Sequence, residues 1–460
     1  MKGGMAMASA LGVGALFAAC GGTDEPSPAA TPPPPPPPAE QFTGELRVIG
    51  LGVDLIEPIR QLGERDLGFG LVFDVTDTVT LEQKVLTQPE SFDVWSGYQH
   101  QYDKLWASDN FQPVDRSRIT RWNQVSNIHR QGKLDLASTV CIFGDGDAPF
   151  RTLYVDPDRS GAWPSSKEAP PELQGEFIQW VGEDALATVG EEPPLTKGVP
   201  QNFNMDSVGY NGDVIQLEPT EISWGELFNE QWRGKVALVN EPGVDMQDAG
   251  NAAQALGLME FGTLGNMTKQ EIDGLTQIMI EFKKDGHFRA FWSTFDESVS
   301  LMSSGEVVIE SMWSPAVALL VTLGINVRYA APIEGFRGWA SQQGIPAHVT
   351  DPMKLQAVYD YLNWWHSGEP GAIMMRQGYY NAVQEPSRAF VEPEEWDFWI
   401  EGQPAAKDLP GITGNVGDIK AGTIRDGGSF SDRSCRYSSW NSFFTETEHQ
   451  VARWSEFLSA

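Results

Sequence analysis

Short apolar segments alternate with helical ones between residues 46 and 95, and this order restricts the possible folds more than any other feature of the chain. Residues 46–49, 71–75 and 92–95 have the pattern of buried strands, because each is a brief run of mainly apolar side chains. Residues 56–63 and 81–86, which lie between those runs, have the spacing of helices. Strands that alternate with helices predict a parallel sheet with helices on its faces. We therefore expect an α/β fold.

The middle of the chain carries weaker patterns, and regular ones return after it. Residues 116–205 are rich in Pro, Gly and Asp, which predicts loops and insertions. Residues 206–210 and 235–239 then indicate strands. Residues 223–226 and 268–271 have the spacing of capping boxes, so we expect a helix to begin at each of them.

The length and the charge of the chain exclude several classes of function. A chain of 460 residues is too long for one ordinary core and predicts two or three domains. Asp and Glu total 63 against 32 Lys and Arg, which gives a formal net charge of −31. A chain this acidic repels a phosphate backbone and an anionic membrane surface, so we expect no nucleic-acid partner.

The first 42 residues have the composition of an export signal and a spacer. Residues 1–19 contain one positive charge and a weakly apolar stretch that is too short to span a membrane as a mature helix. Residues 16–21 resemble a bacterial lipobox, in which Cys20 would carry a lipid and become the first mature residue. Residues 20–42 include seven consecutive prolines and predict a stiff polyproline II linker. We expect a periplasmic protein anchored through Cys20, with simple secretion and a twin-arginine signal as the alternatives.

Two cysteines remain in the folded part of the chain. Cys141 and Cys435 form an even pair in an exported protein, which predicts one disulfide between them. Two buried free thiols are the alternative, because the sequence does not fix the distance between the two residues.

No motif for catalysis or metal binding stands out. The six histidines lack the close spacing of metal ligands, and neither a nucleophile elbow nor a phosphate-binding glycine loop occurs. Residues 156–161 begin like a calcium loop, but Lys167 occupies the position where a glutamate should close it, so a surface turn is the better interpretation. We therefore predict no metal, no cofactor and no catalytic residue.

A series of short motifs keeps a common order along the chain. They are residues 46–50, 92–94 with 102–105, 207–211, 223–227 with 234–236, 304–307 with 312–314, 332–335 with 339 and 345–346, and 378–379. Together they resemble the solute-binding proteins of bacterial ABC importers, and most of all the spermidine/putrescine-binding branch. The resemblance covers residues 46–381, apart from an insertion at about 116–200, and the tail from about Phe390 matches nothing in it.

The resemblance implies a two-lobe periplasmic binding protein fold. Each lobe would be a mainly parallel sheet flanked by helices, and hinge strands would join the lobes around a ligand cleft. We assign residues 43–205 with 340–395 to lobe 1 and residues 206–339 with 396–460 to lobe 2. The implied protein is a monomer that carries a small molecule to a membrane permease and its ATPase, without catalysis.

The resemblance also implies aromatic walls for the cleft. It places Trp313, Trp339 and Tyr379 there, where the family stacks rings on an alkyl-ammonium chain. A ring face attracts a cation by about 0.5–2 kcal/mol, so the chemistry is sound. Core packing is the alternative for each ring, since tryptophan is usually highly buried.

Acids and further side chains complete the expected site. The resemblance places Glu241 where one ammonium sits, with Asp245 close by. Tyr98 and His100 follow the third strand and should face the cleft. Asp54 is the only charge left after the first strand, where the family has an aromatic and acidic cluster.

Two departures from the family pattern bear on the ligand. The acid expected two residues after Trp339 is Ser341, and Arg337 lies near the site. A buried diamine needs a carboxylate near each ammonium, so the loss of one acid counts against a polyamine. We expect a small polar amine, with a polyamine as the default and a smaller cation, a zwitterion or an amino-acid-like solute as alternatives. An exported enzyme or a sensor lipoprotein on the same scaffold is the alternative function.

Overall fold

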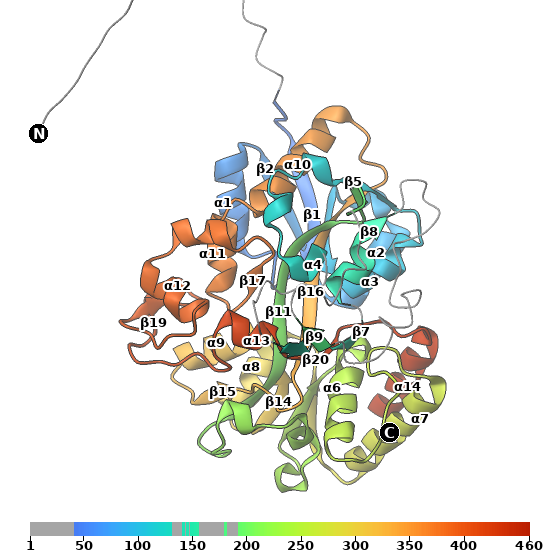
Figure 1. Cartoon of the computed structure of the whole chain (residues 1–460). Helices are drawn as coiled ribbons and strands as arrows, with labels where there is room; N and C mark the ends of the chain where they lie inside the picture. The colour runs from blue at the N-terminus through green and yellow to red at the C-terminus, as the bar shows by residue number, and fades with distance from the viewer. Residues whose placement is uncertain (1–40, 131–139, 143, 147, 156–178, 182–191) are drawn as a thin grey trace, which may run out of the picture. The chain divides into compact units, whose positions relative to one another are not determined.

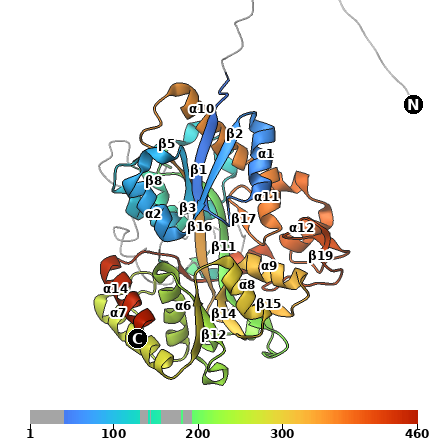
Figure 2. The same cartoon turned by 180° about the vertical axis from the view of Figure 1, so that it is seen from behind.

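The computed structural model (Figures 1 and 2) describes residues 41–130, 140–142, 144–146, 148–155, 179–181 and 192–460. The chain divides into Met1–Gln41 and a compact unit, Phe42–Ala460, which carries every element described below. The predicted signal, Cys20, nearly all of the linker and the calcium-like loop at 156–161 lie outside the described residues. Within the described part of the chain, no helix combines the length and the apolarity needed to cross a bilayer.

One large mixed sheet runs through the unit Phe42–Ala460. Its main path has the order β13-β12-β14-β11-β16-β3-β1-β2. The bounds are β1 (Glu45–Leu51), β2 (Gly70–Thr76), β3 (Val94–Tyr98), β11 (Val199–Asn211), β12 (Val236–Val239), β13 (Phe288–Trp292), β14 (Ile309–Met312) and β16 (Phe336–Pro346). β1 pairs in parallel with β2 and β3, and β12 pairs in parallel with β13 and β14. The predicted α/β class with two parallel groups of strands is confirmed.

The long strands β11 and β16 join the two parallel groups. They pair antiparallel with each other, and β11 continues from β16 and β17 (Tyr380–Asn381) to β14 and β15 (Val327–Tyr329). β16 pairs with β3 and with β4 (Phe111–Gln112) near its carboxyl end. We call the part around β1–β3 the first lobe and the part around β12–β14 the second lobe. The exact residues at which the lobes divide stay a prediction.

Helices cover both parallel groups of strands (Figures 1 and 2). The first lobe has α1 (Glu57–Leu67), α2 (Thr78–Thr87), α3 (Gln99–Trp106) and α10 (Pro352–Trp365), and its core holds Trp95, Tyr102 and Trp365 without exposed surface. The second lobe has α6 (Pro242–Ala255), α7 (Lys269–Lys284), α8 (Phe295–Ser303), α9 (Ser314–Thr322) and α14 (Thr447–Ser459). Complete burial of one such large apolar side chain stabilises the fold by roughly 1.5–3 kcal/mol.

Shorter elements complete the chain. The remaining helices are α4 (Asn127–Arg130), α5 (Pro149–Leu153), α11 (Glu369–Met375), α12 (Pro393–Trp399) and α13 (Phe430–Ser434). A three-stranded sheet contains β5 (Val114–Asp115), β8 (Tyr154–Val155) and β10 (Leu195–Thr196). Two small pairs are β6 (Val140–Ile142) with β9 (Gln179–Val181) and β18 (Leu409–Pro410) with β19 (Val416–Ile419). β7 (Asp145–Gly146) pairs with β20 (Tyr437–Trp440).

The start of β11 corrects the sequence prediction, which placed a strand only at 206–210. The strand begins at Val199, within the region assigned to loops. Its residues up to Tyr210 are all buried, so the strand lacks the polar and apolar alternation of a half-exposed strand. Polar side chains inside it make buried hydrogen bonds, such as that of Gln201 with Ser96. Because these polar residues interrupt the apolar pattern of a buried strand, the sequence did not indicate a strand here.

One of the two predicted capping boxes is confirmed and the other is wrong. Thr268 accepts from the Glu271 amide, and the Glu271 side chain accepts from the Thr268 amide, so this box opens α7. A short helix does begin at Ser223, whose side chain accepts from the Gly225 amide, but it is the 3₁₀ helix Trp224–Phe228 and the reciprocal bond from Glu226 is missing. Glu226 instead accepts from the side chains of Asn229 and Trp232. Glu334, which is distant in sequence, accepts from the Ser223 hydroxyl and the Trp224 amide.

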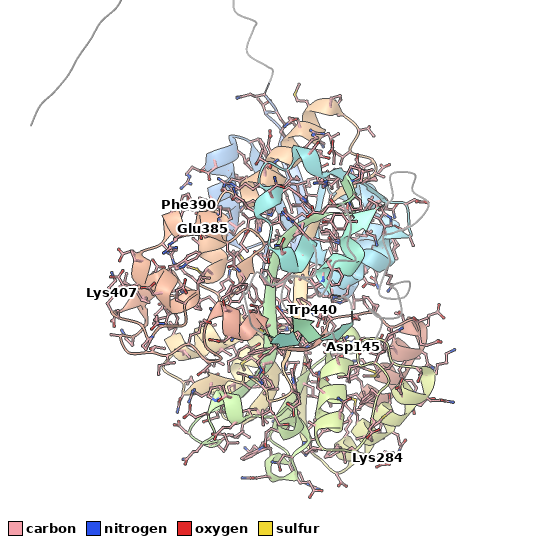
Figure 3. The ribbon with its side chains drawn as sticks, viewed as in Figure 1. Asp145, Lys284, Glu385, Phe390, Lys407 and Trp440 are labelled. Carbon is pink, nitrogen blue, oxygen red and sulfur yellow. The ribbon has the colours of Figure 1, made fainter. Side chains whose placement is uncertain are left out.

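The segment from Phe390 to Ala460, which we call the C-terminal extension, contacts both lobes. Glu395 in α12 pairs with Arg376 after α11 (2.8 Å), and α11 packs near α1 of the first lobe. Further along, β20 pairs in parallel with β16, and Trp440 lies near Asp145 where β20 meets β7 (Figure 3). Finally α14 packs on α7, where Lys283 donates to the carbonyls of Phe457 (2.9 Å) and Leu458 (2.7 Å).

Cys435 is in a disulfide. The backbone of Cys141 is in β6, and its side chain lies outside the described part of the chain. The pairing of Cys435 with Cys141 therefore stays a prediction.

Candidate functional site

The carboxyl ends of the parallel strands of both lobes carry several of the residues that sequence reasoning singled out. Asp54 follows β1, and Tyr98 ends β3. Glu241 follows β12, and Trp313 follows β14. Ligands of open α/β sheets bind at these ends, because the loops there leave a crevice beside the sheet.

Four of the predicted residues form one contiguous group of rings, the ring cluster. Trp339 contacts Tyr98 edge-to-face, with ring centroids 5.5 Å apart, and contacts Tyr379 in the same way at 4.9 Å. The Tyr98 ring stacks on His100 at 5.5 Å. Tyr98 reaches Trp339 because β3 pairs with β16, where Tyr98 lies opposite Ser341. All four rings are buried.

Trp313 is not part of the ring cluster. It precedes α9 and packs its ring edge-to-face on Trp292 of β13, with centroids 4.9 Å apart. Its side chain is only half-buried. The structure therefore separates Trp313 from the other two predicted wall residues, Trp339 and Tyr379.

Two buried aspartates flank the ring cluster, Asp54 from the loop after β1 and Asp206 from β11. Asp54 accepts a hydrogen bond from Asn202 of β11 (2.9 Å), and burial raises its pKa to about 6. Asp206, also in β11, accepts from the Tyr329 hydroxyl (3.3 Å), and burial again raises the pKa to about 6. Sequence reasoning missed Asp206 as a site residue. The signal was the polar run inside β11, which is unusual for a buried central strand.

Two acids approach from the second lobe. Glu241 precedes the first turn of α6, and burial raises its pKa to about 7, against the opposing effect of Arg337. Asp245 lies one turn later without exposed surface, and burial together with the charge of Asp248 raises its pKa well above the usual range. A carboxyl in this state takes up a proton or a cationic partner.

Arg337 is the buried cation among these acids. Its Nε donates to Asp248 Oδ1 (2.6 Å), and its Nη1 donates to Asn441 Oδ1 (2.6 Å). Asp248 also accepts from Ser311 (2.6 Å). Asp248 thus neutralises the charge of the guanidinium, which leaves little attraction at this place for a carboxylate ligand. Asp248 was not predicted.

Some polar side chains at the site lack a hydrogen-bond partner among the described residues. The Ser341 hydroxyl faces the backbone of Asn202, whose amide donates to it (3.2 Å). The Ser207 hydroxyl and both polar atoms of the Gln247 side chain are buried without a hydrogen-bond partner among the described residues. Buried groups of this kind normally have partners, so they point to a ligand or to ordered water.

The acids Asp54, Asp206, Glu241, Asp245 and Asp248, which we call the acid cluster, outnumber the cation at the site. Both the acid cluster and Arg337 are buried, and the charges of Glu241, Asp206 and Asp54 all act on Tyr98, which places the ring cluster in their field. Unpaired buried carboxylates are costly, so the arrangement suits a positively charged ligand. No group of three side chains suited to a metal ion occurs among the described residues.

Comparison with known sequences gives one family. The sequence profile of the family described as "Bacterial extracellular solute-binding protein" matches residues 61–388, which is more than two thirds of the chain. No curated protein shows a significant sequence match.

Solved structures resemble the fold over nearly the whole chain. One is a putative spermidine/putrescine ABC transporter from Listeria monocytogenes, with a TM-score of 0.54 and 12% identity over 90% of this chain and 98% of that one. Another is the spermidine/putrescine ABC transporter substrate-binding protein PotD from Streptococcus pneumoniae, with a TM-score of 0.52 and 13% identity over 91% of this chain and 99% of that one. AgtB from A. tumefaciens R10, in complex with agropinic acid, has a TM-score of 0.52 and 12% identity over 91% of this chain and 100% of that one.

Proposed function

Because the chain belongs to the family of bacterial extracellular solute-binding proteins, we propose that it binds a small cationic amine and serves as the substrate-binding component of an ABC importer. The family membership makes the chain a solute-binding protein and disfavours the exported enzyme. The proposal about the amine is carried by one observation, the excess of buried carboxylates around the ring cluster.

The ring cluster and the acid cluster supply complementary interactions with an ammonium. A cation over the face of an indole or phenol ring gains about 0.5–2 kcal/mol. The same cation restores charge balance to the carboxyls whose burial raises their pKa. An anion or a neutral sugar would leave those carboxyls uncompensated.

Acids approach the ring cluster from both lobes, which favours a diamine or polyamine over a monoamine. Asp54 and Asp206 are in or beside the central strands, whereas Glu241 and Asp245 belong to the second lobe. Asp206 supplies a second acid near the rings, where Ser341 replaces the acid expected from the family pattern. The names of two structural neighbours, both spermidine/putrescine proteins, point to the same ligand class.

Calorimetric titration of the mature protein with putrescine, spermidine and butylamine tests this assignment. Trp339→Ala and Asp206→Asn should each weaken diamine binding at least tenfold. Glu310→Gln is the matched control, because Glu310 is an equally buried acid that accepts from Ser298 in α8, away from the ring cluster. If none of the amines binds, or if Trp339→Ala and Asp206→Asn bind as well as the control, the amine assignment is wrong.

We propose further that a lipid on Cys20 tethers the protein to the periplasmic face of the membrane, beside the permease and its ATPase, as a monomer. The lipobox at 16–21 and the proline-rich linker at 20–42 support this. Labelling with radioactive palmitate should mark the wild-type protein and fail to mark Cys20→Ser. Equal labelling of both would contradict the anchor.

A further inference from the structure

A cavity lies between α9 and the C-terminal extension. Its volume is about 100 Å³, which is enough for a small organic ion or several waters. Val317 and Val321 of α9 line one part of it, and Trp399 of α12 and Ile419 of β19 line another. Most of the wall is therefore aliphatic or aromatic. Phe390 and Lys407, which belong to the C-terminal extension, are labelled at the left of Figure 3.

Two buried arginines also line this cavity, Arg425 and Arg433. Arg425 is 8% exposed and donates to the carbonyl oxygens of Trp399 and Gly378. Its guanidinium carbon lies 5.0 Å from the ring centroid of Tyr380. Burial, together with the like charge of Arg433, lowers the pKa of Arg425 to about 10. The contacts of Arg425 with carbonyls and rings hold the guanidinium in place without neutralising its charge.

Arg433 has the same kind of surroundings. It is 2% exposed and donates to the carbonyl oxygens of Asp426 (3.0 Å) and Met205 (3.1 Å). Its guanidinium carbon lies 4.9 Å from the ring centroid of Phe336. Its Nε is buried without a hydrogen-bond partner among the described residues.

Nearby carboxylates do not neutralise these two arginines. Asp426, which also lines the cavity, is held by Arg328, whose Nη2 lies 2.9 Å from Oδ1. A third arginine of the lining, the half-buried Arg376, is neutralised by Glu395. Within the described part of the chain, neither Arg425 nor Arg433 makes an ion pair. Two like charges thus line one small apolar cavity, an arrangement that an anion would stabilise.

We propose that this cavity binds the carboxylate of a small organic acid with an apolar body. The planar guanidinium groups match the geometry of a carboxylate, and the aliphatic and aromatic wall accommodates the hydrocarbon part. Both arginines lie in the C-terminal extension, beyond the residues 61–388 that match the family. The proposal rests on these arginines and on the cavity wall, so it does not depend on the amine assignment.

Calorimetry and thermal unfolding of the mature protein with sodium benzoate, butyrate and inorganic phosphate, at equal ionic strength, test the proposal. Benzoate and butyrate should bind and raise the unfolding temperature, and phosphate should have no such effect. Arg425→Met should weaken benzoate binding at least tenfold. Arg289→Met is the matched control, since Arg289 is an exposed arginine paired with Glu306, and it should leave benzoate binding unchanged.

A second variant covers the case in which Arg425→Met does not fold. Val321→Phe fills the cavity and keeps both arginines, so benzoate binding should be lost while putrescine binding persists. The proposal is overturned if neither benzoate nor butyrate binds, if phosphate binds as well as benzoate does, or if Val321→Phe binds benzoate like the wild type. Putrescine binding without benzoate binding would overturn this proposal alone, and the reverse result would overturn only the amine assignment.

Discussion

Replacing Arg337 by methionine should destabilise the fold by about 3–5 kcal/mol, because the change removes one partner of a buried ion pair. Arg337 is 1% exposed and lies 2.6 Å from Asp248. In the variant, Asp248 keeps only the hydrogen bond from Ser311, and Asn441 loses the donor to its side-chain oxygen. The cost is therefore that of an uncompensated buried carboxylate, not the small loss of a surface ion pair.

Equilibrium unfolding in urea, followed by tryptophan fluorescence, measures this cost. Arg328→Met is the control, because Arg328 also contacts an aspartate, Asp426 (2.9 Å), but its side chain is 31% exposed. That variant should lose about 1 kcal/mol or less. Combining Arg337→Met with Asp248→Leu should recover most of the stability, since no buried charge then remains unpaired.

The pH dependence of the free energy of unfolding gives a second test of the role of Arg337. Arg337 opposes the pKa rise that burial causes at Asp206 and Glu241. Without Arg337, the folded state favours protonated acids more strongly, so the loss of stability should be smaller at pH 5 than at pH 8. If Arg337→Met costs no more than Arg328→Met at pH 8, the buried pair does not have the energetic role inferred here.

Two further predictions concern the ligand-free protein and its disulfide. Asp54 and Asp206 have pKa values of about 6 when folded, above the unfolded value of about 4. Each therefore contributes stability, about 3 kcal/mol, that is complete only below the unfolded pKa and is lost as the pH rises through 6. Asp206→Asn should flatten the stability curve over that range, and an unchanged curve would contradict the assignment. Mass spectrometry of the unreduced protein should detect one peptide that joins Cys141 to Cys435, whereas a peptide that joins Cys20 to Cys435 would refute the predicted pairing.

Local patterns predicted much of the first lobe. Residues 46–49, 71–75 and 92–95 lie in or overlap parallel strands, because short apolar runs between helices have few other possible arrangements. The pattern failed where a strand is buried on both faces and also carries polar side chains. Gln201 and Asn202 in β11 look like loop residues until their buried partners are known.

The candidate site was predictable only in part, for a similar reason. Motif order indicated Trp339 and Tyr379, the position after the third strand indicated Tyr98, and the structure brings these three rings together. Asp248 gave no signal, because an acid within a helix usually faces solvent. Its contact with Arg337 joins residues 89 positions apart, and sequence spacing contains no information about such a pair.

The C-terminal extension adds a third backbone connection between the lobes. β11 and β16 provide two continuous strands, and the extension begins beside α11 near the first lobe, adds β20 to β16 and ends packed on α7 of the second. Any rotation of one lobe against the other must therefore bend three connections instead of two. For the hinge rotation that the family resemblance implies, we therefore expect the extension to stiffen the motion that sets how long the protein holds its solute.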